Sequence, residues 1–183
     1  MEDASMTKTT QMVISVLASD RPGIVTELTE VITDNGCNVE DSRMSVLGGE
    51  FAVIMLITGN WNNLVKLESV LESLGEKQGL TVNHKRTQSR TLTQGGIPYH
   101  VEAISLDHPG IVHKVASFFS SRNINIHDLY TTSQPAAHTG TPMFILNMTV
   151  EIPSSTHIAS LRDQFMEFCD QLNLDAVIEP VKG

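Results

Sequence analysis

The sequence predicts an α+β fold made of two similar units, each with the element order β-α-β-β-α-β. Residues 18–25, ASDRPGIV, return as residues 105–112, SLDHPGIV. The same offset of 87 residues (107 − 20) places Asn-Val-Glu-Asp of 38–41 on Asn-Ile-His-Asp of 125–128. A period of this length is too long for a solenoid repeat and suits a small domain. We therefore expect this division of the chain: tail 1–10, first unit 11–86, linker 87–97, second unit 98–183.

Local patterns predict the elements of the first unit in order. The side chains of residues 11–18 alternate between a fully apolar face and a mixed face, which predicts a strand. The helix that follows is expected to start at Asp20, which can cap it, with Pro22 in its first turn. Gly36 suits the left-handed position that ends this helix.

The rest of the first unit contains a hairpin, a second helix and a last strand. Strands at 38–47 and 51–58 flank a Gly-Gly turn at 48–49. Leucines at helical spacing predict an amphipathic helix over 60–78, and residues 80–86 form a fourth strand.

The second unit repeats this order, with a turn at Pro153 and a helix cap at Ser155. Its hairpin loop, 134–141, is longer and is interpreted as mobile; a lid, a partner contact and a simple insertion all remain open. The order matches the ferredoxin-like split βαβ pattern, which gives antiparallel sheets. Its expected elements are strand 98–106, helix 109–122, strand 125–134, strand 142–152, helix 155–172 and strand 174–181.

Composition limits the possible partners. The net charge is −9, whereas a protein that binds DNA directly needs a basic face. The only local basic cluster, Lys85, Arg86 and Arg90, is interpreted as a solvated linker. We therefore expect no direct contact with nucleic acid, and any effect on transcription would act through another protein.

The chain has features of a cytoplasmic protein. Its longest apolar run, 51–57, is too short to span a membrane, and residues 1–11 lack the apolar segment of a signal peptide. Cys37 and Cys169 are the only cysteines, and we expect two buried free thiols.

The repeated turn has a geometry that suits a ligand. Gly23 and Gly110 lack a Cβ, so a ligand can approach the backbone closely. A helix start offers free N–H groups and a positive dipole end to a carboxylate. The same turn could also be a helix start without any ligand. Acceptors for an ammonium group could come from polar residues present in both units: Asp20, Asp107, Asn38 and Asn125.

Catalytic and metal-binding motifs are missing from the sequence. It contains no phosphate-binding loop, no dinucleotide fingerprint, and no His-x-x-x-His or Cys-x-x-Cys spacing. No nucleophile with a base and an orienting group can be assembled from its motifs. We therefore expect no enzyme, no metal and no cofactor.

The two turn motifs, each followed by Asn-Val/Ile-x-Asp, resemble the ACT domain family over about residues 11–86 and 98–181. The resemblance implies modules that bind amino acids and pair side by side, joining their sheets. It places ligands at the seam between the first turn of one unit and the second strand of its neighbour. The implied residues are Asp20, Pro22, Gly23, Ile24 and Asn38 for one site, and Asp107, Pro109, Gly110, Ile111 and Asn125 for the other.

For a chain of two such units, the resemblance implies a non-catalytic, glycine-responsive repressor of glycine cleavage genes that acts through a LysR-type activator. A detached regulatory subunit of an amino-acid or one-carbon enzyme is the alternative, and an interaction module without a working pocket is a third. The first copy has Arg21 where the second copy has His108, and this difference puts equal affinity at the two sites in doubt. Exposed sheet edges make a homo-oligomer plausible.

Overall fold

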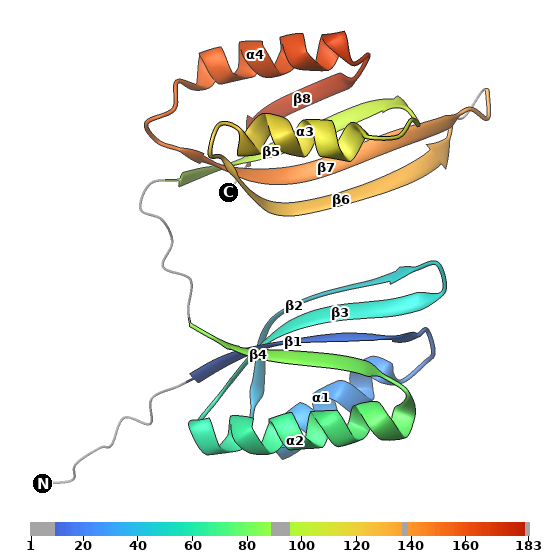
Figure 1. The fold of residues 1–183 in the computed structure, drawn as a ribbon, viewed down its shortest axis with the longest axis vertical. Coiled ribbons are helices and arrows are strands. Elements are labelled where there is room, and N and C mark those ends of the chain that lie inside the picture. The colour runs from blue at the N-terminus through green and yellow to red at the C-terminus, as the bar shows by residue number, and fades with distance from the viewer. Residues whose placement is uncertain (1–9, 89–95, 137–138, 182–183) are drawn as a thin grey trace, which may run out of the picture. The chain divides into compact units, whose positions relative to one another are not determined.

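A computed structural model describes residues 10–88, 96–136 and 139–181. The chain divides into two compact units, one within residues 1–91 and the other within 92–183 (Figure 1). Each unit has the predicted βαββαβ order and its own four-stranded antiparallel sheet, which confirms the α+β, ferredoxin-like fold. The side-by-side pairing of the two sheets stays a prediction.

The first unit has the strand order β2-β3-β1-β4. Its hairpin turns on Gly48 and Gly49, whose φ angles of +62° and +87° require glycine-like freedom, as the sequence predicted. Its elements are β1 (Thr10–Ser19), α1 (Ile24–Asp34), β2 (Asn38–Leu47), β3 (Glu50–Gly59), α2 (Trp61–Gln78) and β4 (Thr81–Thr87).

The second unit repeats the topology in the order β6-β7-β5-β8. Residues 1–9 of the expected tail, the middle of the linker at 89–95 and the loop residues 137–138 lie outside the described residues. The elements of this unit are β5 (Gly96–Leu106), α3 (Ile111–Ser120), β6 (Asn125–Pro135), β7 (Pro142–Pro153), α4 (Ile158–Gln171) and β8 (Asp175–Pro180).

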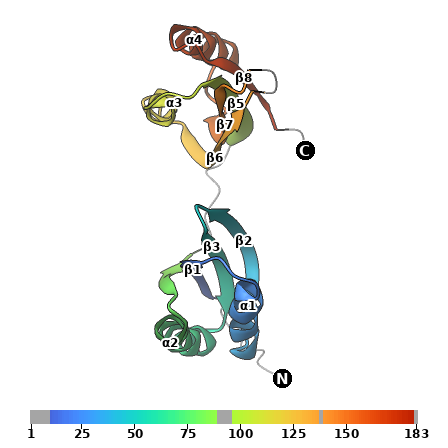
Figure 2. The ribbon, with the colours of Figure 1, turned by 90° about the vertical axis from the view of Figure 1, so that its right-hand side faces the viewer.

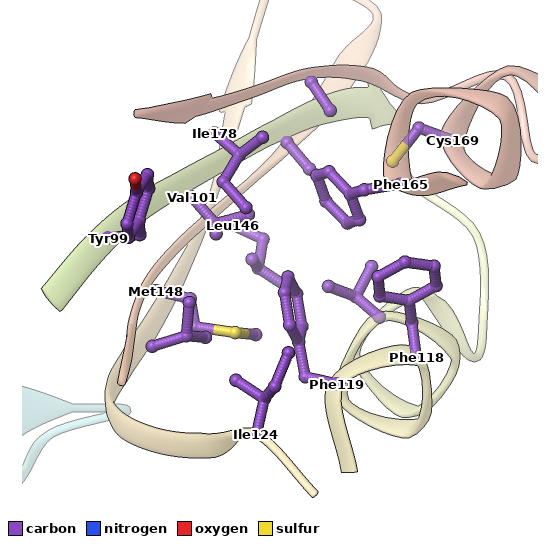
Figure 3. Packing of buried hydrophobic residues seen from close by; sticks show 14 of the residues in the cluster. Tyr99, Val101, Phe118, Phe119, Ile124, Leu146, Met148, Phe165, Cys169 and Ile178 are labelled. Carbon is purple, nitrogen blue, oxygen red and sulfur yellow. The ribbon is translucent and has the colours of Figure 1, made fainter. Parts of the chain in front are cut away.

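Both helices of a unit cover one face of its sheet, and the core lies between the helices and the sheet (Figures 1 and 2). Alternate residues of the central strands therefore point inward, which explains why the period-two pattern predicted them. In the second unit, Phe119 and Phe165 are fully buried, with ring centroids 5.2 Å apart (Figure 3). The sheet and its core give each turn a rigid support.

Three predicted helix starts are wrong. Helix α3 begins at Ile111 rather than at residue 109, with Gly110 as its N-cap. Helix α1 begins at Ile24 with Gly23 as its N-cap and no side-chain cap, so Asp20 lies too far upstream to cap it and Pro22 precedes the helix. Helix α4 begins at Ile158, because the turn after Pro153 continues to Thr156. The side chain of His157, not Ser155, accepts the capping bond, from the N–H of Ser160 at 3.3 Å.

The basic cluster is only partly a surface feature. Arg86 belongs to β4, and its Nε donates to the carboxylate of Glu68 on α2 at 2.6 Å, which corrects its interpretation as a solvated linker. Arg90 lies outside the described residues. Both thiols are buried and free, as predicted. No described helix is long and apolar enough to cross a membrane.

Candidate ligand-binding site

The two turns have nearly the same backbone. Gly23 has φ +94° and ψ −13°, and Gly110 has φ +93° and ψ 1°. The first helical bonds run from the N–H of Glu27 to the carbonyl of Gly23 and from Lys114 to Gly110, at 2.9 and 3.0 Å. The N–H groups of the first three residues of each helix therefore have no acceptor within the helix. Each turn presents a set of donors that suits a carboxylate.

The residues on either side of each glycine have different positions. Ile24 and Ile111 are buried, with 2% and 1% of their surface exposed, so they anchor the first residue of each helix in the core. Pro22 and Pro109 are exposed and precede the glycines. The isoleucines hold each turn in place, and the exposed prolines lie on its solvent side.

Both predicted aspartates lie beside the turn in their unit. The N–H of Asp20 donates to the carbonyl of Gly49 at 3.0 Å, and that of Asp107 donates to Pro142 at 3.3 Å. These bonds connect each turn to the hairpin at the same end of the sheet (Figure 1). The aspartate side chains are exposed, so they are accessible to an ammonium group.

The predicted asparagines lie at the other end of each sheet. Ser19, where β1 ends, pairs with Glu50 of β3, whereas Asn38 pairs with Thr58. Eight residues of β3 separate these two pairs, which is about 26 Å along an extended strand. Asn125 pairs with Glu151 and is separated in the same way from the second turn. The structure therefore does not bring either asparagine to the turn of its own unit.

An ion pair lies beside the first turn. The guanidinium of Arg21 donates two hydrogen bonds to the carboxylate of Glu27, both at 2.7 Å, and one to Oε1 of Gln78 at 2.5 Å. A Cβ built on Gly23 would lie 3.6 Å from Oε1 of Glu27, so the carboxylate lies beside the glycine. We call Arg21, Glu27 and Gln78 the clasp.

The hydrogen bonds from Arg21 lower the pKa of Glu27, while its slight desolvation acts in the opposite direction. The Arg21 guanidinium has a raised pKa, chiefly through the same bonds. The clasp is therefore fully charged at neutral pH and loosens only as the pH falls through the lowered pKa of Glu27. The carboxylate of Glu27 therefore lies near the first turn, although it does not cap the helix N–H groups.

The second turn has no clasp. His108 replaces Arg21 and Lys114 replaces Glu27, so the first turn of α3 contains no acidic residue. Nδ1 of His108 lies 3.3 Å from the carbonyl of Pro109. Apart from Gly110 and its chain neighbours, no described residue places a heavy atom within 4 Å of a Cβ built on Gly110. This turn is open and has a cationic side chain where the first turn has a carboxylate.

Sequence reasoning missed the clasp and its replacement in the second unit. The offset of 87 residues that aligns the turns also aligns Glu27 with Lys114, so an extended repeat comparison would have found this pair. Gln78 has no comparable signal, because only the fold brings the end of α2 beside the turn. Among the described residues, no group of three potential metal ligands is present.

Comparisons with known proteins agree with this architecture. A family model of the ACT domain matches residues 10–85. A glycine cleavage system transcriptional repressor from Escherichia coli (strain K12) is 33% identical over 170 residues, which cover 93% of this chain and 90% of the relative.

Two solved structures cover nearly the whole chain at 28% identity. One is a putative glycine cleavage system transcriptional repressor, with a TM-score of 0.73 over 96% of this chain and 99% of that one. The other is an unknown protein from Galdieria sulphuraria, with a TM-score of 0.83 over 96% and 100%.

The two-unit fold and its paired glycine turns define a regulatory protein built from ACT domains. Within this class, the chain belongs to the family of the glycine cleavage system transcriptional repressor.

Proposed function

We propose that this protein is a non-catalytic, cytoplasmic sensor of glycine that represses glycine cleavage genes through a protein partner, a LysR-type activator. The observation that carries the proposal is the pair of glycine turns in a chain that aligns with the named repressor over 93% of its length. The net charge of −9 supports action through a protein rather than through direct contact with DNA.

The open turn suits a small amino acid. The free N–H groups at the start of α3 would donate hydrogen bonds to the carboxylate, and Asp107 at the same turn would attract the ammonium group. Gly110 leaves space because it has no side chain. Asn38 and Asn125 would take part only if a neighbouring unit supplied them, as the family resemblance implies.

The clasp makes the two sites unequal. Glu27 competes with the carboxylate of a ligand at the first turn, whereas Lys114 adds a favourable charge at the second. The second turn therefore binds glycine first, and the first turn stays closed. Glycine shifts the balance between the free and the partner-bound protein only if these two states differ in their affinity for glycine.

Calorimetric titration with glycine tests the proposal, with serine and alanine as comparators. We expect saturable binding selective for glycine at one site per chain. Exchanging the turn residues between the copies tests the inequality. R21H/E27K should create an additional glycine site at the first turn. H108R/K114E should abolish glycine binding at the second turn.

Each result separates the parts of the proposal. Binding of another amino acid would keep the sensor and refute glycine as its ligand, and no binding by the folded chain would refute the sensor. Two equal sites in the unaltered chain would refute the role of the clasp. Reconstituted repression that needs the activator would support the proposed partner, and association with a metabolic enzyme instead would overturn it.

A further inference from the structure

A groove of about 600 Å³ lies between α3 and α4 in the second unit. The residues that line it belong to these helices and to positions 121 and 122 just after α3. None of the turn residues 107–111 lines it, although it shares Lys114 with the surroundings of the second turn. We call it the α3–α4 groove.

The groove has an aromatic floor. The rings of Phe118 and Phe168 line it, with centroids 5.0 Å apart. Phe118 also contacts Phe165 of the core, so the floor is continuous with the packed interior (Figure 3). An apolar side chain that enters the groove would cover this surface and be removed from water there.

One wall of the groove contains a cation with a fixed position. The guanidinium of Arg122 lies 3.8 Å from the centroid of the Phe118 ring. It donates to the carbonyl of Phe118 and to Ser121, and its Nε and Nη2 donate to Gln164 of α4. These bonds use four of its five N–H groups within the described residues. The guanidinium is therefore held in place with one N–H on Nη2 left for an acceptor.

The groove is more positive than the chain as a whole. Lys114 and Arg122 line it against a single carboxylate, Glu167, with His113 beside them, although the net charge of the chain is −9. Within the described ranges, neither Lys114 nor Arg122 has a carboxylate within 4.0 Å. Both cations are available to a partner with negative charge.

The repeat shows that this charge is not a property of the fold. At the offset of 87 residues, Lys114, Ser117 and Ser121 correspond to acidic residues around α1. These residues are Glu27, Glu30 and Asp34. The two helices share their turn and their buried face, but they differ in charge along the face that lines the groove.

We propose that the α3–α4 groove binds an acidic segment of the protein partner. An apolar side chain of that segment packs on Phe118 and Phe168, and its carboxylates face Lys114 and Arg122. Charge complementarity identifies the occupant as acidic, and the aromatic floor requires an apolar anchor. The proposal rests on the proposed function only for the existence of a protein partner.

The test uses a fluorescein-labelled synthetic helix of acidic residues with a phenylalanine and two leucines on one face. A second peptide has lysine at each acidic position. Fluorescence anisotropy measures the binding of both peptides to the full chain. Ser117→Glu and Ser121→Asp introduce the residues that α1 carries at these positions, so a helix of this type accommodates them. Ser120→Glu is the matched control, because Ser120 is exposed on α3 and does not line the groove.

We expect the acidic peptide to bind the unaltered chain and Ser120→Glu equally, and at least tenfold more weakly to Ser117→Glu and Ser121→Asp. Binding should also weaken as salt is added. Equal losses in all three variants, equal binding of the lysine peptide, or no binding would overturn the proposal. Self-association that Ser117→Glu abolishes would identify a second copy as the occupant and would also overturn it.

Calorimetry with glycine on the same variants separates this proposal from the proposed function. The substitutions lie outside the turn, so glycine binding should persist in all of them. Peptide binding by a chain that binds no amino acid would keep the groove and refute the sensor. Glycine binding without peptide binding would keep the sensor and refute the groove.

Discussion

Gly110 has a φ of +93°, a value at which a Cβ would be strained against the neighbouring backbone. The space around it is open among the described residues, so the cost of a side chain there comes from the backbone rather than from a collision. The same argument applies to Gly23 at φ +94°. A substitution at either turn is therefore expected to affect stability as well as the close approach of a ligand.

Gly110→Ala should lower the free energy of unfolding by about 1–3 kcal/mol, the usual cost of a left-handed conformation at a non-glycine residue. Urea denaturation followed by circular dichroism measures this change. His113→Ala is the control on the same helix, because His113 is exposed and its loss should matter by less than about 0.5 kcal/mol. Equal effects of the two substitutions would show that the backbone strain is absent.

The two thiols should be unreactive in the folded protein. Burial, with a smaller contribution from Asp170, raises the pKa of Cys169 to about 12. Burial also raises the pKa of Cys37, although the charge of Arg86 partly opposes it. Since the thiolate is the reactive form, a raised pKa leaves little of it at about pH 8.

Titration with a thiol-specific disulfide reagent at this pH checks the thiols. We expect almost no reaction in buffer and reaction of both cysteines in guanidinium chloride. Rapid labelling of Cys169 in the folded protein would contradict its burial. Cys37, which has 8% of its surface exposed against 0% for Cys169, should react first as denaturant is added.

At the scale of elements, the sequence predicted the strands and helices well because each has a periodic pattern that burial explains. It failed at the starts of α1, α3 and α4, where the length of the preceding turn decides which residue becomes the cap. Asp20 and Ser155 are chemically good caps in the wrong positions. A capping preference does not say how far a turn continues, and this depends on hydrogen bonds such as that from Thr156 to Pro153.

The candidate site was predictable only in part, because local patterns do not show how distant segments are arranged. Gly23 and Gly110 belong to a local motif, so the sequence alone located both turns. Asn38 follows α1 closely in the chain, but β2 begins at the opposite end of the sheet from the turn. The clasp depends on Gln78, which tertiary structure brings to Arg21 from the end of α2.

The cap of α4 gives a direct test of the corrected helix start. His157→Ala removes the acceptor for the N–H of Ser160 and should lower the free energy of unfolding by about 0.5–1 kcal/mol. Ser155→Ala should change it by less, because Ser155 is exposed and precedes the cap. Thermal unfolding of both variants measures the difference. A larger loss in Ser155→Ala would restore the cap that the sequence predicted.

At the scale of the whole molecule, the two units share a topology but fill their cores differently. The core of the second unit contains Phe118, Phe119 and Phe165, whereas Phe51 is the only phenylalanine in the described core of the first. The repeat therefore preserves the pattern of inward positions rather than the residues that occupy them. Each core consists of residues from one unit only.

Because each core is closed within its own unit, we expect residues 1–91 and 92–183 to fold as separate chains. Units of this length can bury an independent, if modest, core. Circular dichroism should show mixed helix and strand content in both fragments, with cooperative thermal unfolding. Phe119→Ala should destabilise the 92–183 fragment by about 3–5 kcal/mol, because it removes a fully buried ring. An unfolded fragment would contradict the independence of the units and would mean that the missing unit supplies part of its stability.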